Sequence, residues 1–167
     1  TRVDAQSIVA ASALPATGSA GYAGPMIAFG GVGENATAGE VRTSFLGDAS
    51  MTVDFEEGTL LGRADSFLEI ANADDWPDDG IDAQLGGPVE GTLTFEGQRA
   101  ASADATYAVR ATGRLEGSDS AFLDFVDVGG SGEMYGAGAE TLVVRGGADV
   151  PFDDQEGFIA YYGVNVR

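Results

Sequence analysis

The acidic segment NADDWPDDGID, residues 72–82, holds the residue types best suited to binding a metal ion. Closely spaced carboxylates and an amide oxygen are the hard oxygen ligands that Ca²⁺ prefers, although the spacing differs from that of the twelve-residue calcium loop. A run of acidic residues is more often a solvated loop, and this alternative stays open. The candidate Ca²⁺ ligands are Asp74, Asp75, Asp78, Asp79 and Asp82.

The glycine-rich segment GAGAET, residues 136–141, begins like a nucleotide-binding loop and then departs from that pattern. Such a loop opens a helix whose N-terminus accepts a pyrophosphate, whereas Glu140 stands near that position here and the strand-like LVVRGG follows. We therefore expect a tight corner between two strands, with Gly136 and Gly138 relieving crowding and Tyr135 packed at the end of the fold.

Three residue types that carry much enzyme chemistry are missing, because the sequence has no histidine, cysteine or lysine. A serine or threonine nucleophile therefore lacks the commonest general base, and thiol and Schiff-base chemistry are excluded. Paired carboxylates could serve a glycosidase, but among 27 acidic residues some pair will be suitably spaced by chance. We expect no catalytic residue and no cofactor other than the candidate Ca²⁺.

The charge balance excludes further classes, since 27 acidic residues face eight basic ones and the formal net charge is −19. Such a surface repels phosphate backbones and anionic lipids, so we expect neither nucleic-acid binding nor membrane insertion. The first residues carry Arg2 and Asp4 and lack a starting methionine. We expect an exported chain with its signal peptide removed, located outside the cell or on a bacterial cell surface.

Alternating apolar and polar residues predict strands from about residue 38 onward. Met51, Val53 and Phe55 share one face, and the same period recurs over 107–115 and 142–144. It also predicts that Phe158, Ala160, Tyr162, Val164 and Val166 form the apolar face of the last strand. Glycine-rich turn signals separate eight or nine such segments. The sequence thus predicts an all-β fold, an antiparallel up-and-down barrel of about eight strands over residues 21–167, preceded by an extended arm over residues 1–20.

Three local signals qualify this pattern. Pro25 predicts that the segment 22–30 is an edge strand or a strand start, because proline cannot donate to a ladder. Gly113 falls on an apolar face and predicts a bend or a close approach of two backbones. The segment SFLEIANADDW, residues 66–76, favours a turn of helix at most.

Four segments resemble the β-barrel domain of transferrin-binding protein B and its bacterial relatives. They are LPATGSAGYAG at 14–24, GDASMTVDFEEGTLLGRADSF at 47–67, GRLEGS at 113–118 and GEMYGAGAETLVVRGG at 132–147. The resemblance spans about residues 13–167 and implies a secreted or surface-held eight-stranded barrel with a filled interior and no catalytic activity. Founding members of that family have two lobes and capture a host iron carrier. This sequence contains one barrel and no anchoring cysteine, so the resemblance implies the barrel rather than transferrin binding.

Two functions follow as expectations. The first is a self-assembling structural subunit of a filament or surface layer, a homo-oligomer or polymer in which the arm adds to a neighbour through Ile8, Val9 and Leu14. The alternative is a capture, solute-binding or adhesion module that holds another extracellular protein at the loops of one barrel end. In that case Trp76, the only tryptophan, would contact the partner if exposed, whereas a ring tucked over the barrel end would not.

Overall fold

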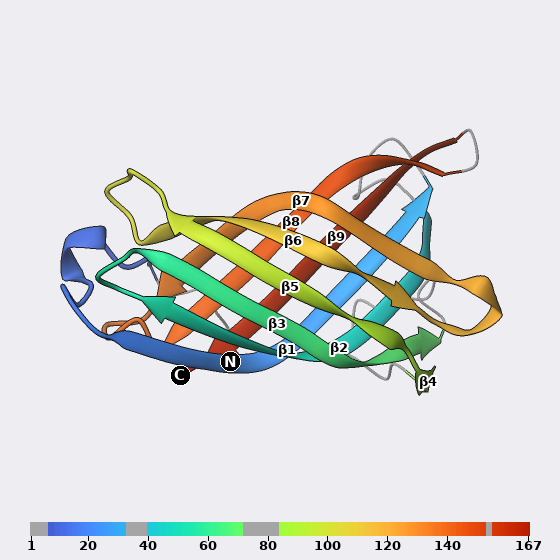
Figure 1. Cartoon of the computed structure of the whole chain (residues 1–167), viewed down its shortest axis with the longest axis horizontal. Coiled ribbons are helices and arrows are strands. Elements are labelled where there is room, and N and C mark those ends of the chain that lie inside the picture. Colours follow the sequence, from blue (N-terminus) through green and yellow to red (C-terminus); the bar gives the residue numbers. More distant parts are fainter. Residues whose placement is uncertain (1–6, 33–39, 72–83, 153–154) are drawn as a thin grey trace.

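Antiparallel strands close into a barrel in the computed structural model, which describes residues 7–32, 40–71, 84–152 and 155–167 (Figure 1). β1 pairs with both β2 and β9, β3 pairs with both β2 and β5, and from β5 to β9 each strand pairs with the next. In the described chain β4 pairs with β3 alone and lies outside the ring of eight. The predicted all-β, eight-stranded, up-and-down barrel is confirmed. The strands are β1 (Ser19–Val32), β2 (Glu40–Asp54), β3 (Thr59–Ala71), β4 (Gln84–Pro88), β5 (Glu90–Arg99), β6 (Thr106–Glu116), β7 (Phe122–Tyr135), β8 (Thr141–Phe152) and β9 (Gln155–Val166).

Short helical turns are the only other regular elements in the described part of the chain. They are two 3-10 turns, η2 (Ala11–Ala13) and η4 (Ser118–Ser120). None of the described residues forms a helix of the length and apolar character needed to cross a membrane.

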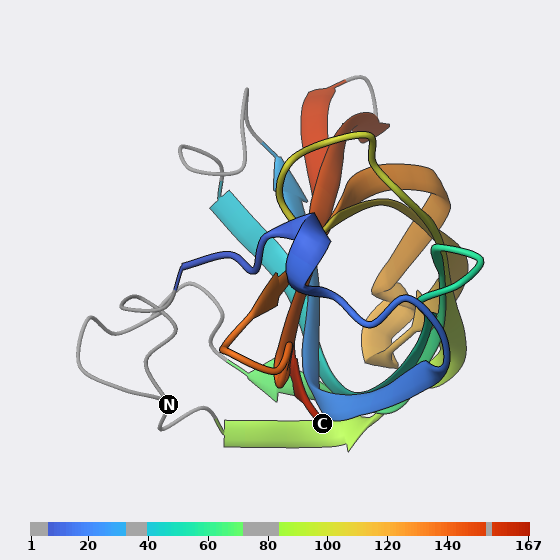
Figure 2. The ribbon, with the colours of Figure 1, turned by 90° about the vertical axis from the view of Figure 1, so that its left-hand side faces the viewer.

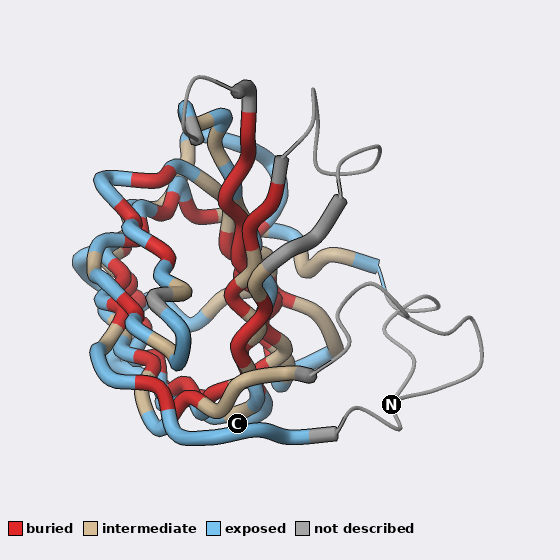
Figure 3. The backbone as a smooth tube through the Cα atoms, turned by 90° about the vertical axis from the view of Figure 1, so that its right-hand side faces the viewer, coloured by how far each residue is buried: buried red, intermediate tan, exposed pale blue. Residues whose placement is uncertain are grey.

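The barrel interior is built from the apolar face that the sequence alternation predicts on most strands. Figure 3 marks which residues along the strands are buried. Met51, Val53 and Phe55 are buried, and so is the face of β6 that includes Tyr107 and Val109. The close approach predicted at Gly113 is also confirmed, because a Cβ there would collide with the carbonyl oxygen of Thr92 on β5. Side chains from all eight strands of the ring thus converge on one core.

The prediction for the last strand has the wrong face. Ile159 and Tyr161 join the core and Asn165 is fully buried, so Phe158, Ala160, Tyr162, Val164 and Val166 lie on the outer wall. Nearly every position of FIAYYGVNV is apolar or small, so alternation carries no information about which face turns inward. Phe158 is nevertheless buried outside the barrel, where its ring packs edge-on against Phe29 with 6.2 Å between the ring centroids.

Two local predictions are also wrong. Pro25 lies in an interior strand, since β1 stands between β2 and β9; its missing N–H is accommodated where the β1–β9 ladder is interrupted, between the Ala23–Val166 and Met26–Gly163 pairs. Residues 66–71, the described part of the segment 66–76, continue β3 and form no turn of helix, whereas residues 72–76 lie outside the described residues. The strand is bulged there, with Ser66 at φ +56 and a register shift opposite Gly47.

Large interior side chains lie against glycines of neighbouring strands. The Tyr161 ring extends from β9 to the wall of β7 and β8, where a Cβ at Gly130 or Gly146 would collide with its hydroxyl oxygen. Phe67 lies on Gly47, and the sulfur of Met51 lies on Gly62, in the same way. Because an eight-stranded barrel is only wide enough to be filled by its own side chains, the missing methyl groups are what admit these large residues.

The barrel is closed unevenly along its length. The β1–β9 ladder runs from Ala23–Val166 to Val32–Gly157, but the β7–β8 ladder covers only Gly130–Gly146 to Tyr135–Thr141. Residues 122–129 of β7 pair with β6 and residues 147–152 of β8 pair with β9, but the two segments do not pair with each other. The two strands diverge there (Figure 1). The barrel therefore has one end with a complete ring and one end with a split between β7 and β8.

The adjacent glycines 129 and 130 offer a direct test of the packing. Gly130→Ala should lower the free energy of unfolding by about 1–3 kcal/mol, because its methyl group would collide with Tyr161 and with the Arg145 carbonyl. Gly129→Ala is the matched control, since no atom lies within 4 Å of its Cβ position, and should change stability by less than about 0.5 kcal/mol. Urea unfolding followed by tyrosine fluorescence measures both, and equal effects would contradict the packing described here.

Candidate functional site

The acidic segment that the sequence singles out for metal binding lies outside the described residues. Asp74, Asp75, Asp78, Asp79, Asp82 and Trp76 all belong to residues 72–83, so the Ca²⁺ site and the tryptophan contact stay predictions. Within the described ranges, no group of three or more acidic side chains is arranged to hold a metal ion.

The apolar residues of the predicted arm lie on the barrel of their own chain. The Val9 N–H donates to the Met134 carbonyl at 2.8 Å, and the Val9 carbonyl accepts from the Ala105 N–H at 2.7 Å. Ile8 forms an isolated bridge with Tyr135, and Val9 and Leu14 pack against the core. The segment crosses the end of the barrel that has the complete ring (Figure 2). A contact of these residues with a partner stays a prediction.

A groove of about 590 Å³ lies on the outer wall, across β5, β6 and β7. Ladder pairs bring its lining together: Glu96 stands opposite Arg110, Gln98 opposite Ala108, and Arg110 opposite Gly129. The centre is hollow because Ala108 has a single methyl group and Gly129 has open space where a side chain would point. We call this surface the outer-wall groove; the residues that define it are Glu96, Gln98, Ala108, Arg110, Asp127 and Gly129.

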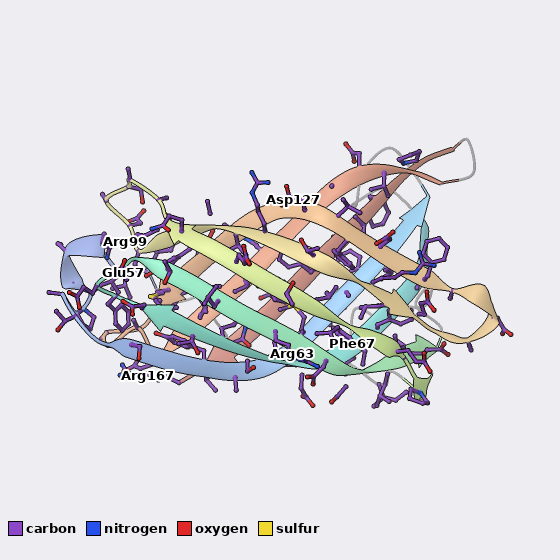
Figure 4. The ribbon with its side chains drawn as sticks, in the orientation of Figure 1. Glu57, Arg63, Phe67, Arg99, Asp127 and Arg167 are labelled. Carbon is purple, nitrogen blue, oxygen red and sulfur yellow. The ribbon has the colours of Figure 1, made fainter. Side chains whose placement is uncertain are left out.

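Polar side chains on the rim of the groove are held in place by nearby groups. The Gln98 side-chain amide donates to the carbonyls of Glu57 and Gly58 at 3.2 and 3.1 Å, which ties it to the turn between β2 and β3. Arg110 forms an ion pair with Asp127. Asp127, labelled in Figure 4, lies in a bulge of β7 at φ +58. Both partners of that pair are more than half exposed, so it positions the guanidinium but contributes little to stability.

A second polar cluster lies beside the groove on β7 and β8. The Glu133 carboxylate accepts hydrogen bonds from the Tyr135 hydroxyl at 2.6 Å, from Arg145 at 2.9 Å and from Ser131 at 3.4 Å. Its side chain is only 12% exposed. This Glu133 cluster joins the two strands where their ladder is intact, at the position of the Tyr135 corner that the sequence predicts.

The pKa values in the cluster follow from these bonds. Burial raises the pKa of the Glu133 carboxyl, but the hydrogen bonds from Tyr135 and Arg145 outweigh burial, so its pKa is lowered overall. The hydrogen bond to the Glu133 carboxylate raises the pKa of Tyr135 to about 12. Glu133 is therefore a fixed anion and Tyr135 a fixed donor at neutral pH, which is the behaviour of a structural link between strands.

The groove is suited to binding rather than to reaction. Its polar groups are carboxylates, a guanidinium and an amide, and none is a nucleophile beside a general base. The tyrosines of the core offer no proton transfer near neutrality, because burial raises the pKa of Tyr107 and raises that of Tyr161 to about 12. Exposed carboxylate, guanidinium and amide groups around a shallow hollow provide hydrogen-bond partners for a backbone or a charged side chain.

Solved structures of transferrin-binding protein B resemble this chain in fold, although its sequence matches no family model and no curated protein. A double mutant of transferrin-binding protein B from Haemophilus parasuis, described as a vaccine antigen, superposes with a TM-score of 0.52 at 19% identity over 96% of this chain. A single mutant of the same protein gives a TM-score of 0.51 at 18% identity over 96% of this chain, and intact Ap-TbpB, with N and C lobes, gives 0.51 at 18% over 95%.

This chain has the barrel fold of transferrin-binding protein B. The predicted resemblance is confirmed at the level of fold. The aligned region is 28%, 29% and 28% of the three larger chains, so this chain spans less than a third of each. Identity this low leaves the ligand and the activity of this chain to be argued from its own residues.

The residues of the outer-wall groove were not singled out from the sequence. Alternation predicts that Glu96, Arg110 and their neighbours face outward, but it does not give the register that brings three strands together. The one available signal is the pair of small residues, Ala108 and Gly129, at outward positions of strands whose other outward residues are mostly polar.

Replacement of Glu133 tests the link between β7 and β8 through a tyrosine titration. In Glu133→Gln the pKa of Tyr135 should fall from about 12 toward the usual value of about 10, since the anionic acceptor that holds the proton is lost. Tyr161 is an internal control, because burial alone raises its pKa to about 12. Ring-resolved NMR titration separates the two, and an unchanged Tyr135 would show that the hydrogen bond is absent.

The same variant makes a prediction for acid stability. A carboxyl whose pKa is lowered by folding stabilises the protein above its unfolded-state value of about 4.5, and this contribution is lost as the pH falls through the folded-state pKa. The difference in unfolding free energy between the natural chain and Glu133→Gln should therefore be constant near neutrality and shrink as the pH falls below about 4.5. Urea unfolding at a series of pH values measures it; a difference that grows on acidification would have the wrong sign.

Proposed function

We propose that this chain is a non-enzymatic capture module, located outside the cell or on a bacterial surface, that holds a protein partner against the outside of its barrel. The observation that carries the proposal is the position of the groove. Side chains fill the barrel, whereas the outer wall offers a hollow with fixed polar groups. Recognition on the outer wall suits a macromolecule better than a small solute, which binds in enclosed sites.

The filled interior is the main reason to look outside the barrel. Aromatic side chains from different strands occupy the axis, and Tyr161 packs edge-on against Phe95 with 5.3 Å between ring centroids. Phe125 adds a third ring, 6.2 Å from Tyr161. All three residues are at most 1% exposed. A ligand inside this part of the barrel would have to displace the core.

The solved structures with the same barrel support the class of ligand. Their name, transferrin-binding protein B, states that those proteins bind another protein. We carry over protein binding as a class, and not transferrin, since the identity is 18–19% and the match spans less than a third of each protein. The net charge of −19 favours a partner with a basic surface.

Assembly into a filament, the first function expected from the sequence, loses its main argument. That expectation depended on residues 1–20 being available to a neighbouring copy. The described part of the segment instead exchanges backbone hydrogen bonds with Met134 and Ala105 of its own barrel. An arm that adds to a neighbouring copy as a strand would first have to leave these contacts. We therefore favour capture over assembly as the function.

The test fills the groove and leaves the rest of the wall unchanged. Ala108→Trp places a large side chain in the hollow, and Ala23→Trp is its matched control on the exposed outer face of β1. Proteins retained by the immobilised natural chain from the culture fluid of its source organism are identified by mass spectrometry. The identified partner should bind Ala108→Trp at least about tenfold more weakly than Ala23→Trp.

Equal binding by the two variants would place the contact elsewhere and overturn the groove assignment. Long polymers of the untagged natural chain in negative-stain images, lost on deletion of residues 1–13, would support assembly in place of capture. Adding Ca²⁺ to the same samples tests whether the acidic residues 72–82 alter either outcome.

A further inference from the structure

The split between β7 and β8 leaves two strand edges beside each other without a shared ladder. In the described chain, no β7–β8 pair follows Gly130–Gly146, although β8 continues to Phe152 in register with β9. In an antiparallel strand, every second residue turns its N–H and C=O toward the neighbour on one side. The edge of β8 over residues 147–150 therefore presents backbone groups toward the position that β7 has left.

The edge of β8 is better suited to pairing than the facing edge of β7. β7 carries a bulge, with Asp127 in the left-handed region and a register shift opposite Thr112, and a bulge twists an edge away from pairing. β8 keeps an unbroken register with β9 from Thr141 to Phe152. Pro151 has no N–H, so it limits a continuous pairing segment to residues 147–150.

Core residues close the inner side of the split. Leu123, Phe125 and Val128 of β7 are buried, and Ala148 and Val150 of β8 pack against the same core. On the outer side, Val126 is 75% exposed. A strand lying in the split would thus meet apolar side chains with its inward residues and solvent with its outward ones, the alternation of a half-buried strand.

Charges around the split favour a basic occupant. The charged residues of β6, β7 and β8 around the split include five carboxylates and three guanidinium groups: Glu116, Asp124, Asp127, Glu133, Asp149, Arg110, Arg114 and Arg145, of which Arg145 pairs with Glu133. Arg110 pairs with Asp127, and Arg114 serves both Glu116 and Asp124, so the local balance is negative. A second copy of this chain would bring another net charge of −19 to the same place, which disfavours pairing between copies.

We propose that the β8 edge in this split takes an extended segment of a protein partner, in which apolar residues alternate with lysine or arginine, as an added strand. This inference rests on the capture function proposed above and names the form of the captured segment. Gly129 and Gly130 line the outer-wall groove and also mark the point where the β7–β8 ladder ends. The groove and the split therefore form one continuous surface, along which main-chain bonds provide affinity and side chains provide specificity.

The test uses a synthetic peptide of about eight residues in which valine and lysine alternate, a length typical of a single strand. Amide hydrogen exchange of the full chain is measured with and without the peptide, and slowing of about tenfold or more is expected at those alternate residues of 147–150 whose N–H faces the split. The control peptide has the same sequence and charge but N-methylated alternate residues, which removes its ladder donors. It should give no slowing.

A matched pair of variants tests the place. Val126→Lys puts a cation at the split, and Val166→Lys makes the same change at a 56% exposed position on β9 at the opposite barrel end. Val126→Lys should weaken peptide binding about fivefold to tenfold relative to Val166→Lys, through repulsion of the basic peptide. Binding of the basic peptide to the natural chain should weaken with added salt, because salt screens the attraction between their charges. Stronger binding at higher salt would contradict this expectation.

Three results would overturn the proposal: equal binding of the N-methylated peptide, equal effects of the two lysine variants, or protection of residues 147–150 that rises with protein concentration in the absence of peptide. The last result would mean that a second copy occupies the edge. If the peptide fails while Ala108→Trp still binds the partner more weakly than Ala23→Trp, only the added strand is refuted and the capture function stands. If the peptide fails and the two tryptophan variants also behave alike, the capture function at this wall fails with it.

Discussion

The fixed width of an eight-stranded barrel is the constraint on which the rest of this structure depends. Backbone hydrogen bonding sets the spacing of the walls, so the side chains must fit the space that the ring encloses. Here the large residues of the core are matched by glycines on facing or neighbouring strands: Tyr161 by Gly130 and Gly146, and Met26 by Gly163. The high glycine content of the chain is thus explained in part by packing volume as well as by turns.

The same matching connects the core to the surface. Gly130 is free of a side chain because Tyr161 occupies its inner face, and Gly129 next to it leaves the outer wall hollow. At this pair the ladder between β7 and β8 also ends. The contact of Tyr161 with Gly130, the hollow of the outer-wall groove at Gly129 and the beginning of the split therefore all occur at one place on β7. Where the β7–β8 ladder is intact, between Gly130 and Tyr135, the Glu133–Arg145 ion pair adds a side-chain link between the same two strands.

The sequence predicts the fold class well and the functional surface poorly, for physical reasons that particular elements show. Alternation identified the inward faces of β2, β5 and β6, because polar residues occupy the opposite faces there. It failed on β9, where Phe158 to Val166 are apolar or small on both faces. The groove depends on register among β5, β6 and β7, and a single sequence contains no direct record of register. The acidic residues 72–82 and Trp76 lie outside the described chain and stay predictions.

The pairing of β1 with β9 determines how the barrel would respond to force. Ala23 lies opposite Val166, so the start of the first strand and the end of the last strand meet at one end of an antiparallel pair. Tension that separates those two points loads the β1–β9 hydrogen bonds one after another, as in opening a zipper, instead of all together in shear. A ladder loaded in this way yields at low force. Residues 8–11 precede β1 and are bonded to Met134, Ala105 and Ala103. Tension applied through the chain before them would break these few bonds first, before it reaches the barrel.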